Sequence, residues 1–173
     1  MLIRTAKKEE LEKVVLLYNS MIDGMQNEKY KPGWKKGIYP DEKFVQEAIE
    51  KQELYVGISD GEFVGAMVVN HEAAGAYETV EWKAAAKPGE VTVIHALGIS
   101  PRHQRQGLAG EMVRDAIDRA PENGQKAVRL DVLAGNVPAQ KFYLSLGFEY
   151  RGTARLYYED TGLTEFLLYE YVV

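Results

Sequence analysis

The chain has 173 residues, no cysteine and a formal net charge of −5, from 21 Lys and Arg against 26 Asp and Glu. Its 46% hydrophobic and 27% charged residues are typical of one ordinary globular domain over residues 1–173, and they argue against disorder, collagen-like repeats and a coiled coil. The absence of cysteine excludes disulfides, a thiolate nucleophile and cysteine-ligated metal sites, and the acidic balance disfavours nonspecific nucleic-acid binding.

The longest apolar stretch, residues 63–69, is far shorter than the ~20 residues that span a bilayer. Residues 1–20 are charged, unlike a signal peptide. We therefore expect a soluble, cytoplasmic protein with no membrane partner. The three histidines lack the close paired spacing of a helical metal site, so no metal is expected; they are His71, His95 and His103.

Hydrophobic spacing and turn residues divide the first half of the chain into elements. In chain order we expect a strand over residues 2–5, a helix over 11–22 capped by Thr5, a loop over 24–40, a helix over 41–49 capped by Asp41, and a hairpin of 54–58 and 63–70 around Asp60 and Gly61. Residues 72–90 then form a long connection of open role, and a connection of that length in a compact domain is usually functional or mobile.

The second half alternates strands and helices. We expect a strand over 91–99, a helix over 107–120 ended by Pro121 and Gly124, a strand over 127–133, a helix from Pro138 to a C-terminal cap at Gly147, and an antiparallel pair of 148–158 and 164–172 around residues 160–162. The predicted element order is βααβββαβαββ, a mixed α/β (α+β) fold.

One stretch of the chain is suited to binding an anion. A strand ends at Ser100, a polar basic turn follows, and Gly107 opens a helix. The first N–H groups of a helix lack internal partners and its dipole favours negative charge, so a phosphate could approach the backbone there. The alternative is an ordinary strand-to-helix turn on a solvated surface.

This turn reads Gln104-Arg105-Gln106-Gly107-Leu108-Ala109. It resembles the cofactor motif Gln/Arg-x-x-Gly-x-Gly/Ala of the GNAT superfamily of acetyl-CoA-dependent N-acetyltransferases. A second element of the resemblance follows downstream, in Asn136, Ala139, Phe142-Tyr143 and Gly147-Phe148. The resemblance covers essentially the whole chain, because the predicted element order is also that of the family.

The resemblance implies a mixed, mostly antiparallel central sheet with helices on both faces and a splayed pair of parallel strands. The strand ending at Ser100 would splay from the strand 127–133, and pantetheine would lie in the gap. The implied acetyl-CoA contacts are Leu97, Gly98, Ile99, Gln104, Arg105, Gln106, Gly107, Leu108, Ala109 and Asn136. The amides of residues 104–109 would hold the pyrophosphate, while Asn136 would bond pantetheine or fix the neighbouring loop.

Two residues are candidates for catalysis. Tyr143 matches the family tyrosine that serves the leaving thiolate, although it also lies on a core stripe. His95 could accept the proton that an alkylamine must lose before attack, because its unperturbed pKa is near ~6.5. It resembles a histidine on the same strand of the arylalkylamine acetyltransferases. A hydrogen-bonded core histidine is the alternative, and the rival bases, acting through water, are Glu72, Glu78 and Glu81.

Four loop aromatics fall where the family borders its acceptor site, although such residues are as often loop anchors; they are Trp34, Tyr39, Tyr77 and Trp82. The predicted function is direct transfer of an acetyl group from acetyl-CoA to a primary amine of a small molecule, peptide or protein. The alternatives are an acyl-CoA-binding regulatory or interaction module without turnover, and use of a longer acyl-CoA. The sequence leaves open which amine is the acceptor and whether the chain forms a homodimer.

Overall fold

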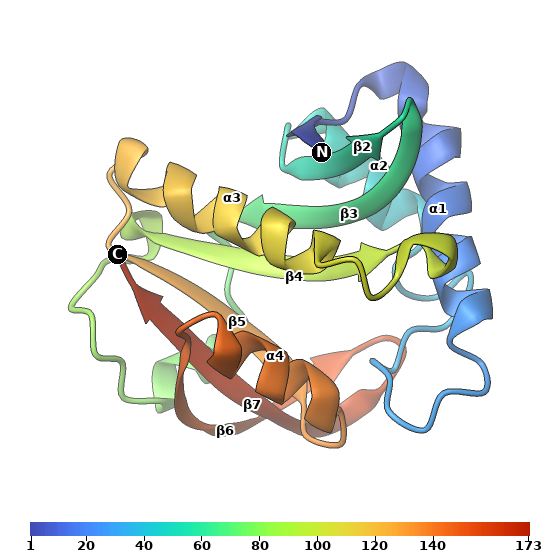
Figure 1. The fold of residues 1–173 in the computed structure, drawn as a ribbon. Helices are drawn as coiled ribbons and strands as arrows, with labels where there is room; N and C mark the ends of the chain where they lie inside the picture. The colour runs from blue at the N-terminus through green and yellow to red at the C-terminus, as the bar shows by residue number, and fades with distance from the viewer. The chain divides into compact units, whose positions relative to one another are not determined.

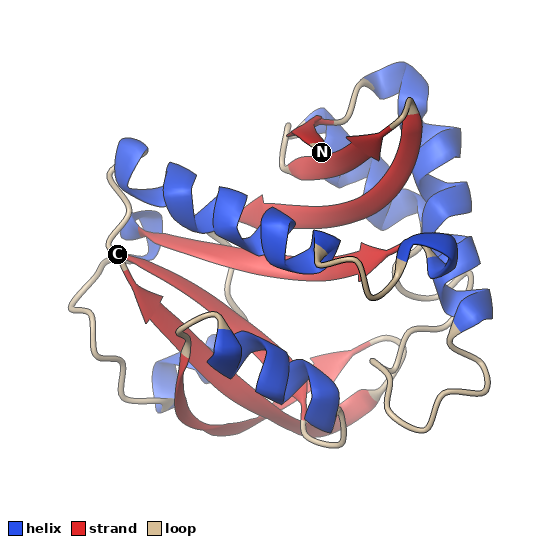
Figure 2. Cartoon of the chain, in the orientation of Figure 1, coloured by secondary structure: helices blue, strands red, loops and turns tan.

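The computed structural model describes residues 1–173 and contains the eleven predicted elements in the predicted order (Figures 1 and 2). The helices are α1 (Leu11–Gly24), α2 (Glu42–Glu50), α3 (Leu108–Glu122) and α4 (Val137–Ser145). The strands are β1 (Leu2–Thr5), β2 (Leu54–Ser59), β3 (Glu62–Asn70), β4 (Val91–Ile99), β5 (Ala127–Leu133), β6 (Glu149–Tyr158) and β7 (Gly162–Val172).

The strands form one seven-stranded sheet in the order β1-β2-β3-β4-β5-β7-β6. β4 and β5 pair in parallel, with Val91–Val93 opposite Ala127–Arg129. The β1–β2, β2–β3, β5–β7 and β6–β7 pairs are antiparallel. The predicted mixed, mostly antiparallel sheet with one parallel pair is therefore confirmed.

The backbone contacts divide the chain into two compact units, and β4 contributes residues to both. Unit 1 comprises Met1–Glu28, Trp34–Val69 and His95–Asp115, and unit 2 comprises Lys29–Gly33, Asn70–Ile94 and Ala116–Val173. The single domain over residues 1–173 stays a prediction. No helix in either unit has both the length and the apolar character needed to cross a bilayer.

Unit 1 buries one face of its strands under α1 and α2. Apolar residues from all four elements meet in this core, which contains Val14, Leu17, Tyr18, Met21, Val45, Ala48, Ile49, Leu54, Val56, Ala66 and Val68. α2 starts where the sequence predicts, because the Asp41 side chain accepts a hydrogen bond from the Phe44 N–H at 2.9 Å. The hairpin turn is also confirmed, with φ of +51° at Asp60 and +78° at Gly61.

The opposite face of the β2–β3 hairpin carries two glycines that give α3 room. Gly57 and Gly65 are paired across the hairpin. A Cβ added at Gly65 would lie 2.7 Å from the sulfur of Met112 in α3, and one added at Gly57 would lie 3.4 Å from the same sulfur. Helices therefore cover both faces of these strands, as the sequence predicts, and the lack of side chains at the two positions permits the close approach.

Unit 2 is built on the long β6–β7 ribbon, with β5 paired to its β7 side. One face packs against the connection 72–90 in a core of Tyr77, Val91, Val93, Ala154, Leu156, Phe166 and Leu168. On the other side, Phe148 after α4 lies 5.6 Å from the rings of both Tyr143 and Tyr171. Pro138 lies in the first turn of α4 and Gly147 follows it with φ of +95°, so both predicted boundaries are confirmed.

Two predicted helix boundaries are wrong. Thr5 does not cap the first helix, because it ends β1, and a 3-10 turn over Lys8–Glu10 leads into α1. Pro121 does not end α3 but lies inside its last turn, and the reversal comes at Gly124 with φ of +72°. In both cases the actual boundary lies a few residues further along the chain, at the 3-10 turn before α1 and at Gly124 after α3. Local residue propensities did not distinguish these positions from the predicted ones.

β4 contains a residue in a conformation that alanine rarely adopts. Ala96 has φ of +49°, in the left-handed region. Its carbonyl accepts a 2.8 Å hydrogen bond from the hydroxyl of Tyr18, whose side chain is fully buried in α1. Burial raises the pKa of Tyr18 well above its usual value, so the phenol stays protonated and keeps donating. A buried donor thus holds the strained backbone between His95 and Leu97.

We expect Glu10→Gln to reveal a pH-dependent contribution to stability. The Glu10 carboxylate accepts bonds from Arg4 at 2.7 and 2.9 Å and from the Lys7 N–H at 2.8 Å, and mainly the Arg4 bond lowers its pKa from 4.5 to about 2. The stabilisation is therefore complete above pH 4.5 and is lost as the pH falls toward 2. After discounting for partial exposure, the variant should lose about 1–2 kcal/mol of unfolding free energy at pH 7.

Denaturant titrations of wild type and variant at pH 7 and pH 2 measure this difference. A deficit of equal size at both pH values would contradict the ion pair as its source.

We expect Ala96→Val to destabilise the fold by about 1–3 kcal/mol, because a β-branched side chain at positive φ is strained. Ala96→Gly is the matched control, since relief of strain offsets the lost methyl group and should leave stability within about 1 kcal/mol. Thermal unfolding of both variants checks the expectation. Equal tolerance of valine and glycine would argue against a strained backbone at this position.

Candidate active site

In unit 1, the predicted cofactor residues of β4 lie against an aromatic side chain. A Cβ added at Gly98 would lie 3.1 Å from the ring of Trp34 and 2.5 Å from the sulfur of Met21, so a side chain there would displace Met21. The Trp34 ring also packs edge-on against Tyr18, with 5.8 Å between centroids. Leu97 and Ile99, on either side of Gly98, are half-buried. Trp34 therefore supports the strand that the sequence assigns to the cofactor.

Tyr39, the second predicted acceptor-site aromatic of unit 1, is anchored in the same way. Its ring lies 5.0 Å from Phe44 of α2, and its backbone pairs with Lys35 in an isolated bridge. The loop between α1 and α2 is thus held by ring packing, and a contact of Tyr39 with an acceptor stays a prediction.

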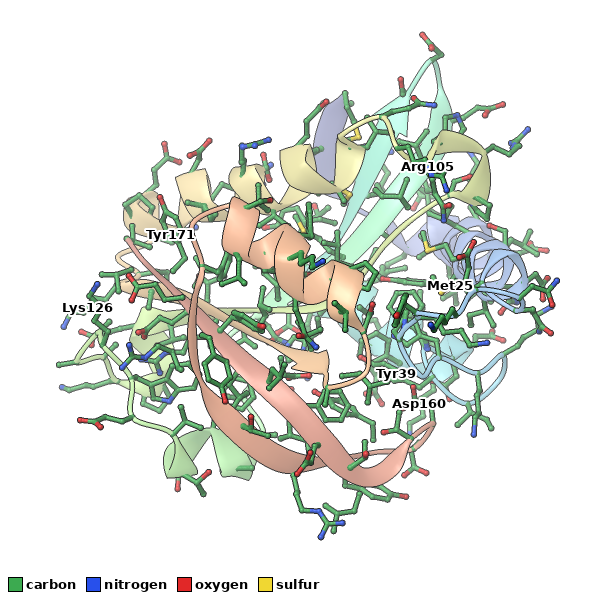
Figure 3. The ribbon with its side chains drawn as sticks, turned by 60° about the horizontal axis from the view of Figure 1, so that its bottom comes forward. Met25, Tyr39, Arg105, Lys126, Asp160 and Tyr171 are labelled. Atoms are coloured by element: carbon green, nitrogen blue, oxygen red, sulfur yellow. The ribbon has the colours of Figure 1, made fainter.

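The turn from Ser100 to Gly107 exposes the start of α3. The His103 N–H bonds to the Ser100 carbonyl at 2.9 Å, Arg105 and Gly107 have φ of +62° and +79°, and α3 begins at Leu108 (Figure 3). The first hydrogen bond of the helix joins the Glu111 N–H to the Gly107 carbonyl at 3.1 Å. The N–H groups of residues 108–110 therefore have no partner within the helix. These N–H groups lie at the N-terminus of α3, the positive end of its dipole.

The surroundings of this turn favour an anion. Residues 104–107 are exposed, and a Cβ at Gly107 would meet no atom within 4 Å. Glu62 lies 3.4 Å from Arg102 and 3.9 Å from the His103 ring, so it balances part of the charge, whereas Arg105 joins no ion pair. The turn therefore presents backbone N–H groups and one uncompensated guanidinium, a combination suited to phosphate oxygens.

In unit 2, the two motif residues of α4 differ in their surroundings. Asn136 occupies the N-cap position, but its side chain forms no capping bond. The Tyr143 ring is half-buried between Phe142 and Phe148, at 5.0 and 5.6 Å. Burial, and secondarily the charge of Asp131, raises the pKa of Tyr143 well above its usual value. Tyr143 is consequently a neutral phenol that can donate a hydrogen bond.

Asp131 was not among the residues singled out from the sequence. Its Oδ2 accepts hydrogen bonds from the hydroxyls of Tyr77, at 2.6 Å, and Tyr158, at 2.9 Å. The sequence did contain a signal, because Asp131 is the one acidic residue in the apolar run of β5. The carboxylate joins the connection 72–90, β5 and β6 within unit 2.

The indole N–H of Trp82 bonds to the Tyr77 carbonyl at 2.8 Å, and its ring is held by a second polar cluster, around Arg129. This side chain stacks on Trp82, with 4.2 Å from the guanidinium carbon to the ring centroid, and forms a 2.9 Å ion pair with Glu170. Glu170, only 1% exposed, also accepts bonds from the N–H groups of Lys83 and Ala84. These bonds satisfy the buried charges and fix the connection to β5 and β7. A contact of Tyr77 or Trp82 with an acceptor stays a prediction.

The candidate bases differ in burial. His95 is half-buried beside Ala96 in unit 1. Glu72, Glu78 and Glu81 are exposed on the connection of unit 2. Which of these four side chains takes the proton of the amine stays a prediction.

Several known proteins that are similar to this chain are named as acetyltransferases. The family model of the acetyltransferase (GNAT) family matches residues 19–148. Over 65 residues the chain is 35% identical to the ribosomal protein bS18-alanine N-acetyltransferase of Escherichia coli K12, covering 38% of this chain and 44% of that relative. It is 28% identical over 124 residues to the N-alpha-acetyltransferase RimI of Mycobacterium tuberculosis, covering 72% and 70%.

Among solved structures, the fold resembles that of YncA from Salmonella typhimurium, which was solved with its cofactor acetyl-CoA. The TM-score is 0.70 at 16% identity, over 99% of this chain and 93% of the other. At this identity the likeness establishes the fold alone, and the Escherichia coli match spans less than half of that relative. The family model, however, covers most of the chain, so the resemblance predicted from the sequence is confirmed. The chain belongs to the GNAT acetyltransferase family.

Proposed function

We propose that the chain is an N-acetyltransferase that moves the acetyl group of acetyl-CoA directly to a primary amine. The observation that carries the proposal is the exposed turn opening α3, where the N–H groups of the helix N-terminus and Arg105 are suited to a pyrophosphate. Leu97, Gly98 and Ile99 immediately precede that turn on β4. Asn136, whose side chain forms no capping bond, is proposed as a further contact to pantetheine.

The proposed reaction forms one C–N bond and breaks one C–S bond. The amine nitrogen attacks the thioester carbonyl carbon, and the thiolate of CoA leaves. Tyr143 donates a hydrogen bond to that thiolate; its high pKa favours this over complete proton transfer. His95 takes the proton that the amine loses. The alternative bases are the carboxylates of Glu72, Glu78, Glu81 and Asp131. With no cysteine in the chain, no cysteinyl intermediate can form.

The proposed acceptor is the α-amine of a polypeptide. Support comes from the printed names of two relatives, an alanine N-acetyltransferase of a ribosomal protein and an N-alpha-acetyltransferase. Thiol release from acetyl-CoA with a panel of peptides and small amines tests this choice. Binding of acetyl-CoA without thiol release from any amine would favour the regulatory-module alternative, and competition among acyl-CoA chain lengths tests the preference for acetyl.

Gly107→Glu should weaken acetyl-CoA binding at least tenfold, or ~1.4 kcal/mol, because it places a negative side chain where the phosphate is proposed to bind. Gly124→Glu is the matched control, since Gly124 has a similar φ of +72° and equally open surroundings at the other end of α3. Calorimetric titration of both variants measures the effect. Equal affinities for acetyl-CoA in the two variants would contradict the assignment of the phosphate site to this turn.

Tyr143→Phe should lower kcat ~10² to 10⁴-fold with little change in acetyl-CoA affinity, because it removes only the hydroxyl that serves the thiolate. Tyr171→Phe is the control, since both rings pack on Phe148 at 5.6 Å. Single-turnover rates separate chemistry from product release. Similar rates in the two variants would assign Tyr143 to the core alone.

His95→Gln should remove the rising limb of kcat/KM with pH, once the ionisation of the amine is accounted for, and leave acetyl-CoA affinity unchanged. His71→Gln is the control, because the His71 ring is bonded to the Val91 carbonyl at 2.7 Å in unit 2. If His95→Gln loses thermal stability but kcat/KM still rises with pH, the role of His95 is structural. The carboxylates, beginning with Asp131→Asn, would then be tested as the base.

A further inference from the structure

A cavity of about 560 Å³ in unit 2 has no role in the proposed chemistry so far. It arises because β5 is shorter than its neighbour. The β5–β7 pairing ends at Leu133 opposite Phe166, whereas β7 remains paired with β6 as far as Gly162. The chain leaves the sheet through Ala134 and Gly135, and the space is lined by Leu133, Ala134, Gly135, Arg155, Thr164 and Glu165.

Two opposite charges border this cavity. Arg155 of β6 and Glu165 of β7 are direct partners in the antiparallel register, and both are exposed. Directly opposite residues have Cβ atoms about 4.5–5.5 Å apart, yet neither side chain joins an ion pair or hydrogen bond. The cavity thus presents a guanidinium and a carboxylate, each able to meet an opposite charge on a ligand.

The position of Glu165 relates the cavity to α4. The Glu165 carbonyl accepts a 3.1 Å hydrogen bond from the Ala134 N–H. Ala134 and Gly135 lead directly to Asn136, the proposed pantetheine contact. Through this bond the backbone of Glu165 adjoins the segment that leads into the proposed pantetheine contact.

We propose that this cavity is the acceptor subsite and that it takes a polypeptide N-terminus followed by an acidic residue. Glu165 attracts the α-ammonium, the form that predominates near neutral pH, and Arg155 binds the acidic side chain of the second residue. The proposal rests on the proposed acetyl transfer, because it places the reacting amine beside Glu165. A basic second residue would meet Arg155 with like charge and bind worse.

The test measures peptide binding to the full-length chain by calorimetry, so it does not depend on turnover. The probes are four-residue peptide amides beginning Ala-Asp, Ala-Asn and Nα-acetyl-Ala-Asp. Each exposed charge pair is worth up to about fivefold in affinity. Wild type should therefore bind Ala-Asp about three- to fivefold more tightly than either Ala-Asn or the acetylated peptide.

Each variant should erase one preference only. Arg155→Gln should bind Ala-Asp and Ala-Asn equally, whereas Glu165→Gln should bind Ala-Asp and its acetylated form equally. Arg114→Gln is the control, because Arg114 is an exposed residue of α3 in unit 1 with no ion pair. Preferences that are absent in wild type, or that persist in both variants, would overturn the subsite.

Thiol release distinguishes failure of the subsite from failure of the proposed function. Selective binding of Ala-Asp without any release of CoA would leave the subsite and overturn the transferase activity. Equal release with all free-amine peptides, unchanged in Arg155→Gln, would leave the transferase and overturn the subsite.

Discussion

The hydrogen bond from Tyr18 to the Ala96 carbonyl is the constraint on which unit 1 depends. It holds a strained residue in the strand that carries His95 and the residues 97–99, and it comes from a phenol that is fully buried in α1. Trp34 packs against both Tyr18 and Gly98, so a loop far from β4 in sequence supports the same stretch. The core of this unit therefore fixes the backbone on which acetyl transfer is proposed to take place.

Local signals in the sequence were sufficient where a single residue decides the backbone. Asp41, the Asp60-Gly61 turn and Gly147 were placed correctly, because capping carboxylates and positive φ have few alternatives. The predictions for Thr5 and Pro121 were wrong because each residue type is compatible with more than one backbone position. A threonine can end a strand as readily as it caps a helix, and α3 accommodates a proline within its last turn.

The polar contacts of unit 2 lay beyond sequence reasoning because they join distant residues. Arg129 and Glu170 are 41 positions apart, and Tyr77 reaches Asp131 over 54 positions. Nothing in the spacing of single side chains specifies such pairs, although the acidic Asp131 within the apolar β5 is a local sign of a polar contact. The motif turn was recognisable because its chemistry depends on backbone groups and consecutive residues.

The two tryptophans of the chain give each unit its own spectroscopic reporter. Trp34 lies in unit 1 against Tyr18 and Gly98, and Trp82 lies in unit 2 under the Arg129 guanidinium. The emission of each indole depends on its immediate polarity and charge, which differ between these two environments. Replacing one tryptophan at a time would let fluorescence follow the melting of one unit without the other, and so reveal whether the two units unfold in one cooperative step or in sequence.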